Sequence, residues 1–330
     1  MSIANITHCG QSPPARHPRL TQTLAMAAML LTSGWLTAAD PPAAKGSTEL
    51  LRDPSFKNGF VLQRPEPGRQ VKCGIVRGKS GGEPVWQLAQ WSSRHPFDQN
   101  TPVAPSAGGG FRLANPARSV SFGGDDGILT LAVNTAAEYG DHPRAGNEPW
   151  VHLLVEQPVA TPPRLGDLTA LRLHLEARRI RARLALEAGY DPGIHAAQFQ
   201  LFLSVQNLEK DSPGFGNYLW FGIPIYDNRH RMIPDYAAPD FGGTGKFIYT
   251  PGTKHFTTGS THDEGWVTFD AELLPLIREG LAAARAKGFL KDSDDESMFR
   301  IAALNLGWEM PGTFDVELQL RSLSLVAARR

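Results

Sequence analysis

The chain of 330 residues has only two cysteines and no excess of charge of either sign. Lys plus Arg number 33, and Asp plus Glu also number 33, so charge gives no reason to expect nucleic acid or an anionic membrane as a partner. We expect Cys9 to be removed with an N-terminal segment, which leaves Cys73 without a partner for an internal disulfide. A lone cysteine in a strand-like stretch is predicted to be buried and inert.

Signatures of catalysis and of cofactor binding are also missing. The histidines form neither HxH nor HExxH, no GxSxG elbow occurs, and "GGTG" at 242–245 is not followed by GK[ST]. The acidic runs at 123–127 and 292–296 lack the full spacing of a calcium loop. We therefore predict no metal ion and no cofactor, and a structural calcium ion has no support in the sequence.

The N-terminal segment has the pattern of a secretory signal. A basic start at 16–19 precedes an apolar run that ends in "TAA" at 37–39. The most apolar part, 24–36, is shorter than the roughly 20 residues that span a bilayer. We expect residues 1–39 to be a cleaved signal peptide and 40–49 a flexible leader. The mature protein would then be periplasmic or extracellular, with no membrane partner.

Residues 50–330 are predicted to form a single all-β domain, a jelly-roll-like β-sandwich. Turn-forming Gly (33) and Pro (26) are spread along the chain and separate short alternating runs such as "LRLHLEA" at 171–177. One prominent helix is expected near 273–287, where leucine and isoleucine recur at helical spacing. Many short strands with few helices are typical of a sandwich. The expected strands are 59–62, 70–77, 85–91, 119–122, 128–134, 150–156, 168–184, 198–207, 218–226, 246–249, 266–270, 299–309 and 313–326.

Two long segments are expected to be loops. Residues 92–110 are irregular, and 227–265 are predicted to be mostly loop with one short strand. A loop as long as the second is more often functional than not.

Alternation along the strands predicts a mixed aromatic and polar surface opposite the core. In "RIAALNLGWE", Leu304, Leu306 and Trp308 would face inward, and Asn305 and Glu309 outward. Applied to the other strands, the same rule selects these outward residues: Trp150, His152, Gln200, Phe202, Gln206, Tyr218, Trp220, Tyr226, Asn305 and Glu309. Aromatic rings stack on the apolar face of a sugar, and amides and carboxylates bind its hydroxyls. The alternative is that a loop or the 273–287 helix covers this surface as a second core.

The first hypothesis is a carbohydrate-binding protein without catalysis. Tyr218 and Trp220 would stack on the sugar, Asn305, Gln200 and Glu309 would bind hydroxyls, and Trp150 and His152 would complete the site.

The second hypothesis is a polysaccharide-degrading enzyme, either a glycoside hydrolase or a lyase. Glu309 would be the general acid or base, with Glu148 or Asp227 as its partner. Arg144 or Arg229 would hold an acidic sugar. Glu138 and Asp240 are further candidates for the second carboxylate. A third hypothesis is a structural envelope protein without a ligand, so the sequence leaves open whether the protein is an enzyme.

With the final strand pair "NLGWEMPGTFDVELQLRSLSL" and the secretory start, the chain resembles bacterial secreted jelly-roll proteins of the carbohydrate-binding-module and polysaccharide-active type. The resemblance covers residues 50–328 and is one of architecture. It implies a last long strand that closes the sandwich, and a glycan partner held by aromatic residues on one face. The ExDxxE signature of one large jelly-roll hydrolase family is absent, which argues against that group.

Overall fold

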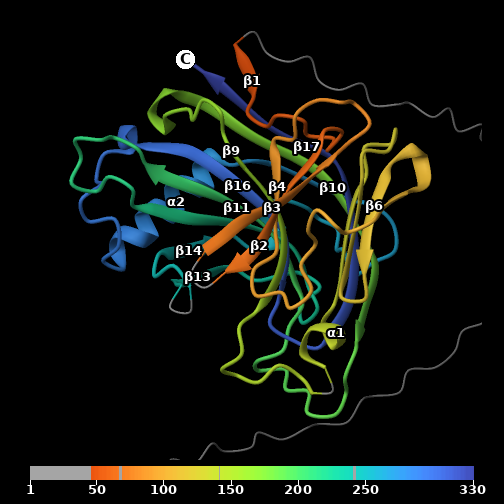
Figure 1. Cartoon of the computed structure of the whole chain (residues 1–330). Coiled ribbons are helices and arrows are strands. Elements are labelled where there is room, and N and C mark those ends of the chain that lie inside the picture. Colours follow the sequence, from red (N-terminus) through yellow and green to blue (C-terminus); the bar gives the residue numbers. More distant parts are fainter. Residues whose placement is uncertain (1–45, 67–68, 141, 241–242) are drawn as a thin grey trace, which may run out of the picture. The chain divides into compact units, whose positions relative to one another are not determined.

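The computed structural model describes residues 46–66, 69–140, 142–240 and 243–330. In this part the chain forms two β-sheets whose apolar sides pack against each other (Figure 1). This confirms the predicted fold class, an all-β jelly-roll-like sandwich. The predicted signal peptide and most of the predicted leader lie outside the described residues.

We call the eight-stranded sheet "sheet A" and the nine-stranded sheet "sheet B". Sheet A contains β1 (Ser47–Glu49), β5 (Val103–Pro105), β6 (Phe111–Asn115), β7 (Arg118–Phe122), β8 (Leu129–Asn134), β10 (Leu168–Leu184), β15 (Val267–Glu272) and β17 (Phe314–Arg329). Sheet B contains β2 (Gly59–Glu66), β3 (Arg69–Arg77), β4 (Trp86–Ala89), β9 (Val151–Pro158), β11 (Gln198–Asn207), β12 (Tyr218–Asp227), β13 (Tyr236–Pro239), β14 (Phe247–Thr250) and β16 (Phe299–Met310).

The strand order places β16 at the centre of sheet B. The order is β13-β14-β12-β11-β16-β9-β4-β2-β3, and only the β12–β14 and β2–β4 pairs are parallel. Sheet A has the order β15-β10-β17-β8-β7-β6-β5, with β1 on the end of β17. Figure 1 shows the long strands β10 and β17 side by side, with β1 near the C-terminus. The last long strand therefore lies inside sheet A.

The core lies between the two sheets and is built by the period-two alternation of their strands. Trp308 of β16 is fully buried and packs edge to face on Phe199, with ring centroids 5.0 Å apart. Its indole Nε1 donates a hydrogen bond of 2.9 Å to the carbonyl of Leu131 in β8. This bond joins the centre of sheet B to sheet A and fixes which side of β16 faces inward.

The predicted helix is α2 (Leu274–Ala286), with Pro275 in its first turn. It packs on the core side of sheet B, because a Cβ on Gly280 would lie 2.7 Å from the Tyr249 ring and 3.0 Å from Leu219. Leu219 is buried and precedes Trp220, which points to the opposite side of β12. The helix therefore does not cover the outer face of sheet B.

Each strand expected from the alternation is present, with ends displaced by a few residues. The sequence did not predict β1, β5, β6, β13 or the short helix α1 (Thr135–Tyr139). Residues 47–49, expected to belong to a flexible leader, pair with β17 instead. The 227–265 segment contains β13 in addition to the expected strand. Among the described residues, no helix is both long and apolar enough to cross a bilayer.

Cys73 is half-buried in β3, and its Sγ lies 3.3 Å from the carbonyl oxygen of Phe97 and 3.5 Å from that of Leu62. Burial raises the pKa of its thiol. A protonated, hydrogen-bonded thiol agrees with the predicted inert role.

Candidate functional site

The candidate site is the outer face of sheet B, the side that points away from sheet A. Along β16, buried Leu304, Leu306 and Trp308 alternate with outward positions. The strand register gives three cross-strand rows on this face, each named from β9 through β16 to β11: His152, Glu309 and Gln198; Leu154, Gly307 and Gln200; Glu156, Asn305 and Phe202. Polar groups from three strands therefore share one surface.

Gly307 has no side chain, so nothing projects from β16 between Asn305 and Glu309 on this face. Its φ of 151° and a Cβ that would lie 2.2 Å from the carbonyl oxygen of Leu153 exclude a side chain there. The half-buried side chains of Asn305 and Glu309 stand on either side of it.

An aromatic group lies at the β12 side of the face. The rings of Tyr218 and Trp220 meet edge to face with centroids 5.0 Å apart, and Phe202 lies 5.9 Å from Trp220. The indole Nε1 of Trp220 donates a hydrogen bond of 3.1 Å to Oγ1 of Thr244. The Trp220 ring is half-buried and held on two sides, which is the arrangement expected of a stacking platform.

Exposed rings mark two limits of the face. Trp150, just before β9, is 43% exposed, and Tyr236 of β13 is 51% exposed. The register β12–β14–β13 places Tyr236 on the same side of the sheet as Trp220. Aromatic side chains on this face therefore occur from the edge strand β13 to the start of β9, which lies beyond the central strand β16.

Two glutamates on this face have pKa values well above that of an ordinary glutamate. Burial raises the pKa of Glu309 to about 7, and the negative charge of Asp240 adds to the effect. Burial alone raises the pKa of Glu156 to about 7. Within the described residues, neither carboxyl has a hydrogen-bond or ion-pair partner. Both groups therefore exchange a proton near neutral pH, as a general acid or base must.

Asp240 follows β13, and its Oδ2 accepts hydrogen bonds from Thr244 through N (2.7 Å) and Oγ1 (2.8 Å). Since the same Thr244 hydroxyl receives the Trp220 indole, Asp240 is tied to the aromatic group. Burial lowers the pKa of His152 to about 4, and the negative charge of Asp240 opposes part of this shift. A hydrogen-bonded carboxylate and a neutral imidazole therefore act on the same part of the face as Glu309.

The structure brings the predicted binding residues onto one face. His152, Gln200, Asn305 and Glu309 occupy the three rows, and Trp150 lies just before β9, two positions before His152. Tyr218 and Trp220 lie on β12, beyond β11 on the same side. Tyr226 differs from the expectation, because an irregularity in the β11–β12 register turns its ring toward Trp308 in the core.

Arg144 and Glu148 serve the loop before β9 and do not line the face. Arg144 is buried, and its guanidinium donates to backbone carbonyls, including those of Pro311, Glu148 (2.8 Å) and Ile194 (3.2 Å). The Ala145 backbone N–H, followed by smaller effects that include Arg94, holds the pKa of Glu148 below its ordinary value. The proposed sugar-binding role of Arg144 and catalytic role of Glu148 therefore receive no geometric support.

Asp227 and Arg229 neutralise each other at the end of β12. Asp227 is buried, and its Oδ atoms accept hydrogen bonds from Arg229 (2.9 and 2.6 Å) and from Gln198 (2.9 Å). Burial opposes ionisation, but the bonds from Arg229 outweigh it, so the pKa of Asp227 lies below its ordinary value. Asp227 is therefore not free to act as a base, and Arg229 is not free to bind an acidic sugar.

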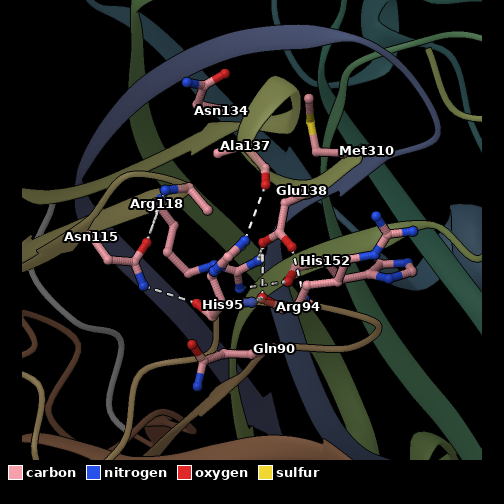
Figure 2. A network of polar contacts seen from close by, with 12 residues as sticks. Gln90, Arg94, His95, Asn115, Arg118, Asn134, Ala137, Glu138, His152 and Met310 are labelled. Carbon is pink, nitrogen blue, oxygen red and sulfur yellow. Dashed lines mark hydrogen bonds and ion pairs between the residues drawn. The ribbon is translucent and has the colours of Figure 1, made fainter. Parts of the chain in front are cut away.

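Glu138, also a candidate carboxylate, belongs to a buried network behind the His152 end of the face. Figure 2 shows it opposite Arg118, with which it forms an ion pair that is fully shielded from solvent. Its other bonds come from the Ser93 hydroxyl (2.8 Å) and the Arg94 backbone N–H (2.7 Å). Arg118 Nη1 lies 3.4 Å from the carbonyl oxygen of His152. The network holds the buried Glu138 side chain inside the loop beside β9.

Glu156 is the site residue that the sequence interpretation left out. The alternation that selected Trp150 and His152 also turned Glu156 outward, so the signal was present. Its significance comes from burial without a partner, which the sequence does not reveal. Among the described residues, no group of three or more His, Cys, Asp or Glu side chains is arranged to hold a metal ion.

No protein-family model and no curated protein matches the sequence. Among solved structures, the chain is similar to the endoglucanase Cel12A from Rhodothermus marinus, with 12% identity and a TM-score of 0.40 over 74% of this chain and 100% of that one. A metagenome-derived glycoside hydrolase family 12 endoglucanase gives 14% identity and a TM-score of 0.39, covering 70% and 100%. A family 12 xyloglucanase from Bacillus licheniformis gives 8% and 0.39, covering 69% and 97%.

Proposed function

We propose that the protein hydrolyses a polysaccharide on the outer face of sheet B, with Glu309 as the general acid. One observation carries the proposal: a half-buried carboxyl without a hydrogen-bond partner among the described residues, with a pKa of about 7, faces the same side as a pair of aromatic rings and several amides. A protein that only binds its ligand has no need of such a carboxyl. Keeping it unpaired costs folding free energy, which is typical of functional sites.

The partner class follows from the side chains on the face. Trp220 and Tyr218 supply flat apolar surfaces, and Gln200 and Asn305 supply amides that both donate and accept. A sugar chain presents C–H faces and hydroxyl edges and satisfies both kinds of group. This supports a glycan as the ligand.

Hydrolysis needs one carboxyl group that gives a proton and one that takes a proton. Glu309 has no hydrogen-bond partner among the described residues, whereas Asp240 accepts hydrogen bonds from Thr244, so we assign the first role to Glu309 and the second to Asp240. Protonated Glu309 gives its proton to the glycosidic oxygen as the bond to the anomeric carbon breaks. A water molecule adds to that carbon and passes a proton to the Asp240 carboxylate. One water is consumed, one new reducing end forms, and solvent exchange restores both carboxyl groups.

The second candidate is glycan binding without cleavage, which the exposed rings of Trp150 and Tyr236 favour because a binding surface needs only stacking platforms. An envelope protein without a ligand receives less support, because unpaired polar groups on a half-buried face serve no packing purpose. Export to the periplasm or beyond stays part of the proposal, since the predicted signal lies outside the described residues.

The test is the release of reducing ends by the purified protein from a panel of soluble β-glucan, xyloglucan, xylan and polygalacturonate. Glu309→Gln should lower kcat by about 10²–10⁴-fold while glycan binding remains, because the amide keeps the shape but has no acidic proton. Glu264→Gln, in an exposed turn, is the matched control and should leave kcat unchanged.

Turnover of Glu309→Gln within a few-fold of the original protein would remove Glu309 from the mechanism. Binding to one of the polysaccharides without release of reducing ends would favour the second candidate.

A further inference from the structure

The row of side chains that contains Asn305 and Glu156 continues across the rest of sheet B. Glu156 pairs with Gln87 of β4, Gln87 with Val61 of β2, and Val61 with Ile75 of β3. Four strand spacings separate Asn305 from Ile75, which is roughly 20 Å along the sheet. The row therefore reaches from the centre of the face to the edge of the sheet.

A hollow of about 730 Å³ adjoins the end of this row. Ile75 lines it together with Lys72 from β3 and with Asp98 and Gln99 from the segment beside the edge strand. That segment is fixed there by a hydrogen bond of 3.1 Å from the Gln99 backbone N–H to the carbonyl of Cys73. The hollow is thus formed by ordered backbone on two sides.

The side chains along the row have the composition of a sugar-binding track. Val61, Gln87 and Glu156 are half-buried, and Ile75 is 38% exposed. Gln87 is oriented by a contact of 3.4 Å from Gln63 Nε2 to its Oε1, which leaves its own amide N–H groups for a ligand. Hydrogen-bonding groups therefore lie nearer the centre of the face, and apolar contact surface lies nearer the hollow.

We propose that an extended polysaccharide lies across the strands from the Glu309 region, over Glu156 and Gln87, to the hollow at β3, which binds a sugar unit remote from the bond that is cleaved. This inference rests on the proposed function and deepens it. It predicts an enzyme whose efficiency rises with chain length, since contacts remote from the reaction contribute binding energy to the transition state.

The experiment compares Ile75→Asp with Ile180→Asp, a matched change at an isoleucine that is 43% exposed on β10 of sheet A. Kinetics are measured on a ladder of oligosaccharides and on the parent polymer that the panel identifies. Ile75→Asp should lower kcat/KM on the polymer by about threefold to tenfold and leave the shortest cleaved oligomer unaffected. Ile180→Asp should change neither value.

The melting temperatures of both variants show whether a loss reflects unfolding, and Ile75→Ala provides a milder change at the same position. An unchanged ratio of polymer to short-oligomer kcat/KM in both Ile75 variants would overturn the distal subsite but leave the hydrolase proposal intact. Failure of the unsubstituted protein to cleave any polysaccharide would overturn both.

Discussion

The two outer faces of the sandwich carry carboxylates in opposite settings. On sheet A two carboxylates belong to ion pairs: Arg321 Nε lies 2.8 Å from Glu176, and Arg181 Nη1 lies 2.7 Å from Glu317. Hydrogen bonding by Arg321 lowers the pKa of Glu176. On sheet B the described residues supply Glu156 and Glu309 with no cationic partner, and both pKa values rise to about 7.

The aromatic side chains differ in the same way. Trp266 directly precedes β15 of sheet A, and the guanidinium groups of Arg178 and Arg321 lie 4.7 and 4.2 Å from its ring centroid. Trp220 on sheet B contacts the edges of two other rings and is oriented by Thr244. In these examples sheet A pairs Glu176, Glu317 and Trp266 with arginines of the same sheet, whereas Glu156 and Glu309 of sheet B have no such partner among the described residues. That difference, more than composition, separates a solvated surface from a candidate site.

After the loss of turnover in Glu309→Gln, the largest expected effect is on glycan affinity. In a Glu309→Gln background, which prevents cleavage, Trp220→Ala should weaken binding by about 1–3 kcal/mol, or roughly fivefold to 150-fold, because a stacking platform is lost. Titration calorimetry with the cognate oligosaccharide measures the change. Trp266→Ala is the control on the other sheet and should leave affinity unaltered. Equal losses in both tryptophan variants would indicate a general loss of structure.

The next effect is on stability as a function of pH. The folded-state pKa of Glu156 lies above its ordinary value of 4.5, so its contribution to the unfolding free energy is present below pH 4.5 and is lost as pH rises through 7. Glu156→Gln should therefore raise the unfolding free energy above pH 7 by on the order of 1–3 kcal/mol relative to the original protein, with no gain at pH 4.

Glu176→Gln on sheet A should have the opposite sign. Its folded-state pKa is depressed, so its contribution is present above the ordinary pKa and is lost as pH falls through the folded value. The variant should lose about 0–1 kcal/mol at neutral pH, since the pair with Arg321 is at the surface. Denaturant titrations across the pH range measure both variants, and a shared sign would contradict the contrast between the sheets.

The smallest effect is on the pH profile. Because the charge of Asp240 contributes to the raised pKa of Glu309, Asp240→Asn should move the alkaline limb of the residual turnover to lower pH, in addition to the loss of kcat expected when the proposed base is removed. Thr244→Val removes one hydrogen bond to Asp240 but keeps its charge, so the limb should stay in place. An unmoved limb in Asp240→Asn would mean that Asp240 does not act on Glu309.

The sequence by itself determined the strands and their inward side. The alternation in "RIAALNLGWE" sent Leu304, Leu306 and Trp308 to the core and left Asn305 and Glu309 outside, because the side-chain period of a strand is two. It missed β1, β5, β6 and β13, which are only three to five residues long and too short to show a period.

Tertiary structure alone decided what covers each face and which charges find partners. It placed α2 on the core side of β12 and β14, so that Trp220 stayed uncovered. It also paired Asp227 with Arg229 and surrounded Arg144 with carbonyls, although both had looked available in the sequence. Pairing and burial depend on segments far apart in the chain, and no local pattern records them.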